Sequence, residues 1–329
     1  MKMITRLLVV FMLFASASLL ADTELLMEKT LNTGKNGLLY VKSLKGSIQV
    51  ETSSASEVRV RIEYRDRGWG RGMEKDEIIE ELDLSIEQDG KNVNVTTRRG
   101  GNGWSWGNKW NKLQLKFFIE VPRDYNVDLN TAGGSISVGD LKGEVKAETS
   151  GGSLSFGSID GPVNASTAGG SINLDGCTGV VRVHTAGGSI NIGDVNGDVD
   201  ARTAGGSISI DKAMGKVNAQ TSGGSINVEE VRGDINAETS GGSVTARISK
   251  QPEGDCRLTT SGGSVTVYLA DDLKMDLDAK AGWGKVYSDF DVLVKGGKVS
   301  KSALRGQING GGPELYLRTS SGKVKVLEL

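Results

Sequence analysis

Four of the five tryptophans lie in two short glycine-rich segments that also carry basic residues. These segments are residues 65–72, RDRGWGRG, and residues 98–112, RRGGNGWSWGNKWNK. An exposed indole offers a stacking plane for a sugar ring or a cation, and arginine suits carboxylate and phosphate groups. These segments are therefore a candidate binding site for an acidic glycan or envelope polymer. Its candidate residues are Trp69, Arg71, Arg98, Arg99, Trp104, Trp106 and Trp110.

Two other interpretations of these tryptophans stay open. In one, the rings pack over the end of the core as a lid. In the other, they contact another envelope protein. Nucleic acid is not an expected partner, because 39 Lys+Arg against 41 Asp+Glu leave a net charge of −2 and no broad basic field.

An internal repeat dominates the chain and must position any site. The motif T-[AS]-G-G-S recurs every 18 residues from Thr131 to Thr239, and another copy begins 21 residues later at Thr260. With each threonine as position 1, apolar residues occupy positions 6, 8, 11, 15 and 17. A spacing of two is typical of a strand with one buried face. Each repeat therefore predicts two strands, with turns at Gly-Gly and at the glycine of position 13.

Units this short bury too little apolar surface alone, so the copies must stack. Stacking in register places identical residues over one another about 4.8 Å apart. We therefore predict an all-β fold, a parallel β-helix or β-solenoid with 18-residue coils. The segments TSSGKV at Thr319 and AGWGKV at Ala281 predict two further, decayed coils.

Residues 1–21 have the composition of a signal peptide. Lys2 and Arg6 precede an apolar run, and small residues lead to Ala21. The run is short for a membrane span and no second one follows. We therefore expect export to the periplasm or the cell exterior, with no integral membrane segment after cleavage.

The rest of the chain divides at the start of the repeat. Residues 22–130 do not repeat, and their alternation predicts longer strands with a hairpin at Asp89-Gly90. We expect this region to be a β cap over the open end of the solenoid, where strand edges would otherwise be exposed. Residues 131–329 hold the repeat solenoid and its C-terminal cap.

The remaining reactive side chains form no catalytic set. His184 is the only histidine, which excludes a histidine-based metal cluster or triad. Cys177 and Cys256 align with inward positions four coils apart, roughly 19 Å, which is too far for a disulfide. We expect two buried free thiols.

Two repetitive surfaces complete the candidates. Positions 5 and 7 carry serine and asparagine, which we expect to hydrogen-bond along the stack. Acidic residues such as Asp140 and Asp194 line one corner. Calcium-binding repeats place the acid beside Gly-Gly, whereas here the two lie at different corners, so we expect solvated turn residues and no metal.

These observations favour a non-catalytic adhesin-like or scaffolding protein without a cofactor. The alternative is a polysaccharide-active β-helix enzyme. Such enzymes set acids or bases on long, irregular coils, whereas these coils are minimal and contain no acidic cluster that breaks the repeat.

Three stretches resemble a known family when taken together. They are LKGSIQVE at residues 44–51, FFIEVPRDYNVDLNTAGGSISV at residues 117–138 and LRTSSGKVKV at residues 317–326. With the intervening coils, the chain resembles the bacterial "putative adhesin" domain family of unknown function. The resemblance implies β-helical repeats over nearly all of the exported chain, and it brings no catalytic residue.

Overall fold

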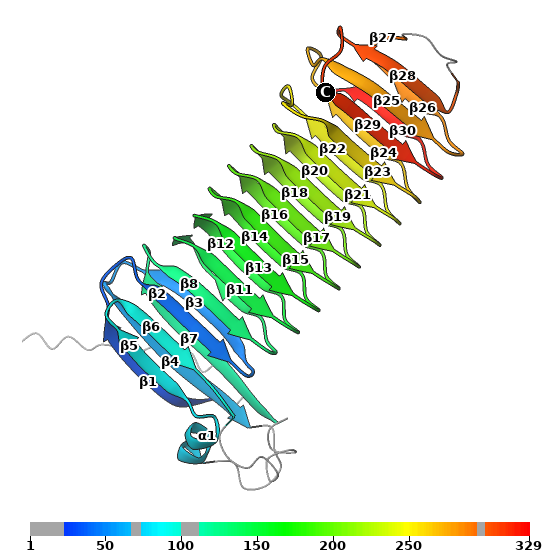
Figure 1. Ribbon diagram of the computed structural model, residues 1–329. Coiled ribbons are helices and arrows are strands. Elements are labelled where there is room, and N and C mark those ends of the chain that lie inside the picture. The colour runs from blue at the N-terminus through cyan, green and yellow to red at the C-terminus, as the bar shows by residue number, and fades with distance from the viewer. Residues whose placement is uncertain (1–22, 67–73, 100–111, 295–299) are drawn as a thin grey trace, which may run out of the picture.

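The computed structural model describes residues 23–66, 74–99, 112–294 and 300–329. The chain forms an elongated stack of coils, with the N-terminal strands and a short helix at one end and the C-terminal strands at the other (Figure 1). Two 15-stranded sheets, called sheet A and sheet B below, run along the stack.

Sheet A contains one strand of every coil and two antiparallel strands of the N-terminal end. In spatial order it comprises β1 (Glu24–Asn32), β4 (Glu57–Asp66), β7 (Leu113–Pro122), β3 (Ser47–Ser53), β9 (Ile136–Val138), β12 (Leu154–Asp160), β14 (Ile172–Cys177), β16 (Ile190–Val195), β18 (Ile208–Ala213), β20 (Ile226–Val231), β22 (Val244–Ile248), β24 (Val265–Leu269), β30 (Val324–Glu328) and β26 (Val286–Ser288), with β10 (Leu141–Lys142) beside β12.

Sheet B contains the other strand of every coil. In spatial order it comprises β27 (Val292–Leu293), β28 (Ala303–Ile308), β25 (Met275–Ala281), β29 (Glu314–Thr319), β23 (Cys256–Thr260), β21 (Ile235–Thr239), β19 (Val217–Thr221), β17 (Val199–Thr203), β15 (Val181–Thr185), β13 (Val163–Thr167), β11 (Val145–Thr149), β8 (Asn126–Thr131), β2 (Leu38–Ser43), β6 (Asn92–Thr96) and β5 (Ser85–Asp89).

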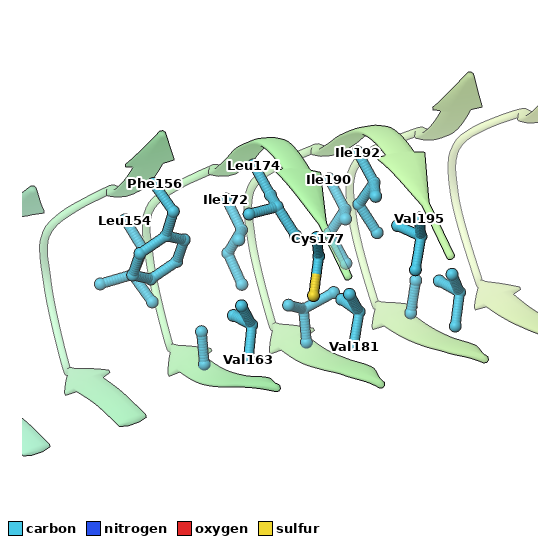
Figure 2. Close-up of a cluster of buried hydrophobic side chains, with 14 of the residues drawn as sticks. Leu154, Phe156, Val163, Ile172, Leu174, Cys177, Val181, Ile190, Ile192 and Val195 are labelled. Atoms are coloured by element: carbon cyan, nitrogen blue, oxygen red, sulfur yellow. The ribbon is translucent and has the colours of Figure 1, made fainter. Parts of the chain in front are cut away.

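The coils stack in parallel and in register, which confirms the predicted solenoid. Ile172 of β14 pairs with Ile190 of β16, and Val181 of β15 pairs with Val199 of β17, each 18 residues further on. The apolar positions point into the space between the sheets, as Figure 2 shows for Leu174, Ile192 and their neighbours. Stacking thus buries apolar side chains that would be exposed to water in a single copy of the repeat.

Both cysteines lie where the repeat predicts. Cys177 is 5% exposed at the end of β14, and Cys256 is fully buried at the start of β23. Both thiols are free. Burial raises the pKa of Cys256 to about 11, which keeps this thiol protonated and unreactive at neutral pH.

The threonine of each motif joins consecutive coils. Its hydroxyl donates to the carbonyl of the second glycine in the preceding coil, for example from Thr185 to Gly170 at 2.7 Å and from Thr203 to Gly188 at 2.8 Å. These threonines are buried. The bond satisfies a carbonyl that the turn leaves outside the strand ladders.

The N-terminal region first adds parallel strands to the stack of coils and then closes its end with antiparallel strands. Strands β2 and β3 form a coil against β8 and β9, and β6 and β7 add a parallel strand to each sheet. Antiparallel pairing of β4 with β7 and of β5 with β6 then ends the parallel order. The predicted hairpin is present, with Gly90 at φ +59°, and helix α1 (Lys75–Glu81) buries Ile78.

At the C-terminal end, sequence order and spatial order differ. Strands β29 and β30 insert between the coil of β23 and β24 and the coil of β25 and β26, although they come last in the chain. Both decayed motifs therefore form coils, as predicted. Strands β27 and β28 close sheet B by antiparallel pairing.

The two glycines of one corner should respond differently to substitution. A Cβ at Gly152 would overlap the carbonyl oxygen of Gly134, whereas at Gly151 the nearest atom is the Cα of Gly133 at 4.0 Å. We expect Gly152→Ala to lower the free energy of unfolding by about 1–3 kcal/mol and Gly151→Ala to change it little. Urea unfolding of both variants measures this, and equal losses would contradict the stacking constraint.

The threonine ladder gives a second prediction. Thr185→Val keeps the side-chain shape but leaves the Gly170 carbonyl without its donor, so we expect a loss of about 1–2 kcal/mol. Thr185→Ser keeps the hydroxyl and should lose less. Thermal melting of the two variants decides, and a valine variant as stable as the wild type would show that the bond is dispensable.

Candidate binding surface

Positions 5 and 7 of the coils form an uncharged polar array on the outer face of sheet A. Over the eight coils that start with Thr131 to Thr260, positions 5 and 7 hold only serine, asparagine and threonine. The pairs are Ser135/Ser137, Ser153/Ser155, Ser171/Asn173, Ser189/Asn191, Ser207/Ser209, Ser225/Asn227, Ser243/Thr245 and Ser264/Thr266. Such a face can exchange hydrogen bonds with a hydroxyl-rich partner over several coils.

All eight serines at position 5 already accept a backbone N–H from the next coil. The hydroxyl of Ser153 accepts the N–H of Ser171 at 3.3 Å, and the hydroxyl of Ser171 accepts the N–H of Ser189 at 3.2 Å. The Asn191 amide donates to the Asn173 carbonyl oxygen at 2.8 Å. The predicted bonding between stacked neighbours is therefore present, and it holds the face flat.

The outer face of sheet B is charged, and its charges pair locally. Lys216 lies 2.9 Å from Asp234 of the next coil, and Arg202 lies 3.0 Å from Asp200. His184 is exposed at its predicted outward position beside Arg202. On its other side, His184 pairs in register with Ser166.

The acidic corner is held by hydrogen bonds to neighbouring coils. Asp140 accepts the N–H of Ser158 at 2.8 Å. Glu230 contacts Arg232 at 2.7 Å and Lys212 at 3.1 Å. These two cations hold the pKa of Glu230 at about 2. Within the described residues, no three His, Cys, Asp or Glu side chains group together as metal ligands would.

Most of the tryptophan-rich candidates lie outside the described residues: Trp69, Arg71, Trp104, Trp106 and Trp110. The described flanks meet at one corner, because Asp66 at the end of β4 pairs with Leu113 at the start of β7. Arg98 and Arg99 are exposed there, and the Arg98 N–H donates to the Leu82 carbonyl at 2.7 Å. Described residues next to the two segments, Asp66 and Leu113, are thus neighbours in sheet A.

The sequence reasoning passed over the fifth tryptophan. Trp283 is 92% exposed in the AGWGKV coil at the opposite end of the stack. The signal for it was present in the repeat, because an indole here replaces the first glycine of the Gly-Gly pair.

Residues 39–327 match the model of the Toastrack DUF4097 family, and the chain belongs to this family. A solved "putative adhesin" from Bacteroides fragilis is similar at 10% identity and a TM-score of 0.35, covering 94% of this chain and 97% of the other. A "putative cell adhesion protein" from Clostridium sporogenes is similar at 11% identity and a TM-score of 0.21, covering 92% and 99%. No curated protein matches the chain. Among the described residues, no helix has the length and apolarity to span a membrane.

The Glu230 contacts predict an acid-dependent stability. The folded-state pKa of about 2 lies below the ordinary value of 4.5, so the unfolded chain binds more protons between these values. The stabilisation is complete above pH 4.5 and is lost as the pH falls toward 2. We expect Glu230→Gln to lower the melting temperature at pH 7 and to approach the wild type near pH 2. The exposed Glu238→Gln is the matched control, and a gap that stays constant with pH would contradict this role.

Proposed function

We propose that this protein is an exported, non-catalytic module of the bacterial cell envelope that holds adhesive or scaffolding contacts on a rigid rod. The observation that carries the proposal is the unbroken register of the coils. From β7 to β26, sheet A keeps every strand hydrogen-bonded to the next, so the two ends are held roughly 50 Å apart at the usual strand spacing.

The chemistry of the described surfaces favours binding over catalysis. The strongly shifted acid, Glu230, is neutralised by Arg232 and Lys212, and the raised thiol pKa of Cys256 reflects burial. Perturbed groups at enzyme sites usually face a cleft with a second reactive group. Here each one serves the packing of the coils.

The tryptophan-rich segments remain the first candidate for recognition. Their described flanks share one corner, so arginines and indoles from both segments can act on one ligand. An acidic glycan or envelope polymer suits this composition, because aromatic planes stack on sugars and guanidinium groups bind carboxylate or phosphate. A partner protein of the envelope is the second candidate.

The experiment compares residues 22–329 with the Trp106→Ala/Trp110→Ala variant on a panel of acidic and neutral envelope glycans. We expect binding to one polymer class and at least about tenfold weaker binding by the variant, because aromatic contacts at interfaces often contribute about 2 kcal/mol. Asn108→Ala/Asn111→Ala in the same segment is the control and should bind normally.

Other outcomes assign other roles. A double variant that melts well below the wild type, together with no glycan binding by either protein, would make the tryptophans a lid and direct attention to a protein partner. Release of soluble sugars from any polymer would overturn the non-catalytic proposal in favour of a polysaccharide-active β-helix enzyme.

A further inference from the structure

The outer face of sheet A changes character at its last two coils. The preceding eight coils carry no charge at positions 5 and 7, but the coil of β30 places Lys323 and Lys325 there, and the last coil places Lys285 and Tyr287 there. Trp283 precedes them at position 3. We call these five residues the terminal patch. Its lysines and Tyr287 lie on the outer face of sheet A within two neighbouring coils, and Trp283 lies in the corner that precedes β26.

The register fixes how the terminal patch is laid out. Tyr287 pairs with Lys325 and Val286 pairs with Val324, so Lys285 lies beside Lys323 in the same way. Adjacent strands are about 4.8 Å apart, and alternate residues of one strand are about 7 Å apart. The Cα atoms of the three lysines and Tyr287 therefore form a rectangle of about 4.8 by 7 Å. The strands that carry this rectangle, β26 and β30, lie at the C-terminal end of the rod (Figure 1).

The rings of the terminal patch contribute little to the core. Trp283 is 92% exposed and Tyr287 is 43% exposed. The backbone N–H of Trp283 donates to the Ser320 carbonyl at 3.0 Å, and a glycine lies on each side of Trp283 in the sequence. The backbone at this corner is therefore held in place while the indole meets solvent. A large aromatic group exposed on a firm backbone is the usual form of an interaction anchor.

The lysines of the terminal patch are free to bind a ligand. Lys285, Lys323 and Lys325 are exposed, and none of them forms a salt bridge with any described residue. The nearest acids along the chain are Asp289, which directly follows β26, and Glu328, which ends β30. The Asp289 carboxylate accepts the backbone N–H of Glu328 at 3.4 Å. The patch is thus a local positive field on a chain whose net charge is −2.

We propose that the terminal patch binds a chain of an anionic polysaccharide. The lysines pair with its carboxylate or phosphate groups, and Trp283 and Tyr287 stack on its sugar rings. The uncharged array of sheet A continues directly from Thr266 beside Lys325, so further sugar hydroxyls can hydrogen-bond along the face. This continuity favours an extended polymer over a membrane surface, which would meet only the end of the rod. The proposal is independent of the tryptophan-rich segments.

The test measures binding of residues 22–329 to a carboxylated polysaccharide (polygalacturonate), a phosphate-bearing one (teichoic acid) and a neutral one (dextran). All variants are made in the Trp106→Ala/Trp110→Ala background, so that the measured binding does not depend on these two tryptophans. We expect binding to at least one anionic polymer, about tenfold weaker in Lys285→Gln/Lys323→Gln/Lys325→Gln, with a shallower salt dependence because fewer counterions are released. Trp283→Ala should weaken binding at every salt concentration while leaving the melting temperature unchanged.

The matched control is Lys250→Gln/Lys274→Gln/Lys280→Gln, which removes the same charge from exposed lysines elsewhere on the C-terminal half. An equal loss in this control would reduce the effect to net charge and overturn the proposal. No binding to either anionic polymer would also overturn it. So would binding to phosphatidylglycerol vesicles that is lost in the lysine variant while the polysaccharides stay unbound, since the patch would then be a membrane contact.

Discussion

The second glycine of each Gly-Gly corner packs against the carbonyl of the same glycine one coil earlier. At Gly170, Gly188 and Gly206, a Cβ would overlap that carbonyl, so this position admits no side chain. This contact lets consecutive coils approach to the strand spacing. The ladders of both sheets, the threonine bonds and the close-packed core all require that distance. The outer faces inherit their regularity from it, because side chains repeat only where the backbone does.

Sequence periodicity predicted the coils well because each position has one physical requirement. Position 6 must be apolar to fill the core and position 4 must lack a side chain, so both are visible in the sequence. The order of the last two coils was not visible, since TSSGKV and AGWGKV have similar patterns. Thr319 explains it: its hydroxyl reaches the Gly263 carbonyl at 2.6 Å, whereas Ala281 has no hydroxyl and occupies the coil that ends the stack.

The candidate sites were harder to predict, for a related reason. Candidate binding residues differ in type from the other residues at their repeat position. The sequence shows this difference, but only the folded structure shows which other residues lie beside them. Trp283 and Lys325 are 42 residues apart in the sequence, yet they belong to adjacent coils because β29 and β30 insert where they do. The tryptophan-rich segments could be recognised by composition alone, because each concentrates its indoles and arginines within a few residues.

Register also has a consequence for how this architecture changes over evolution. Each coil repeats the same contacts above and below it, so a duplicated or deleted 18-residue unit finds a compatible neighbour on either side. The length of the rod is therefore quantised: it can grow or shrink only in steps of one coil, about 4.8 Å. Gain or loss of whole coils during evolution can thus change the distance between the two ends of the rod in equal steps. The structures of the two ends and the surfaces that they expose remain unchanged.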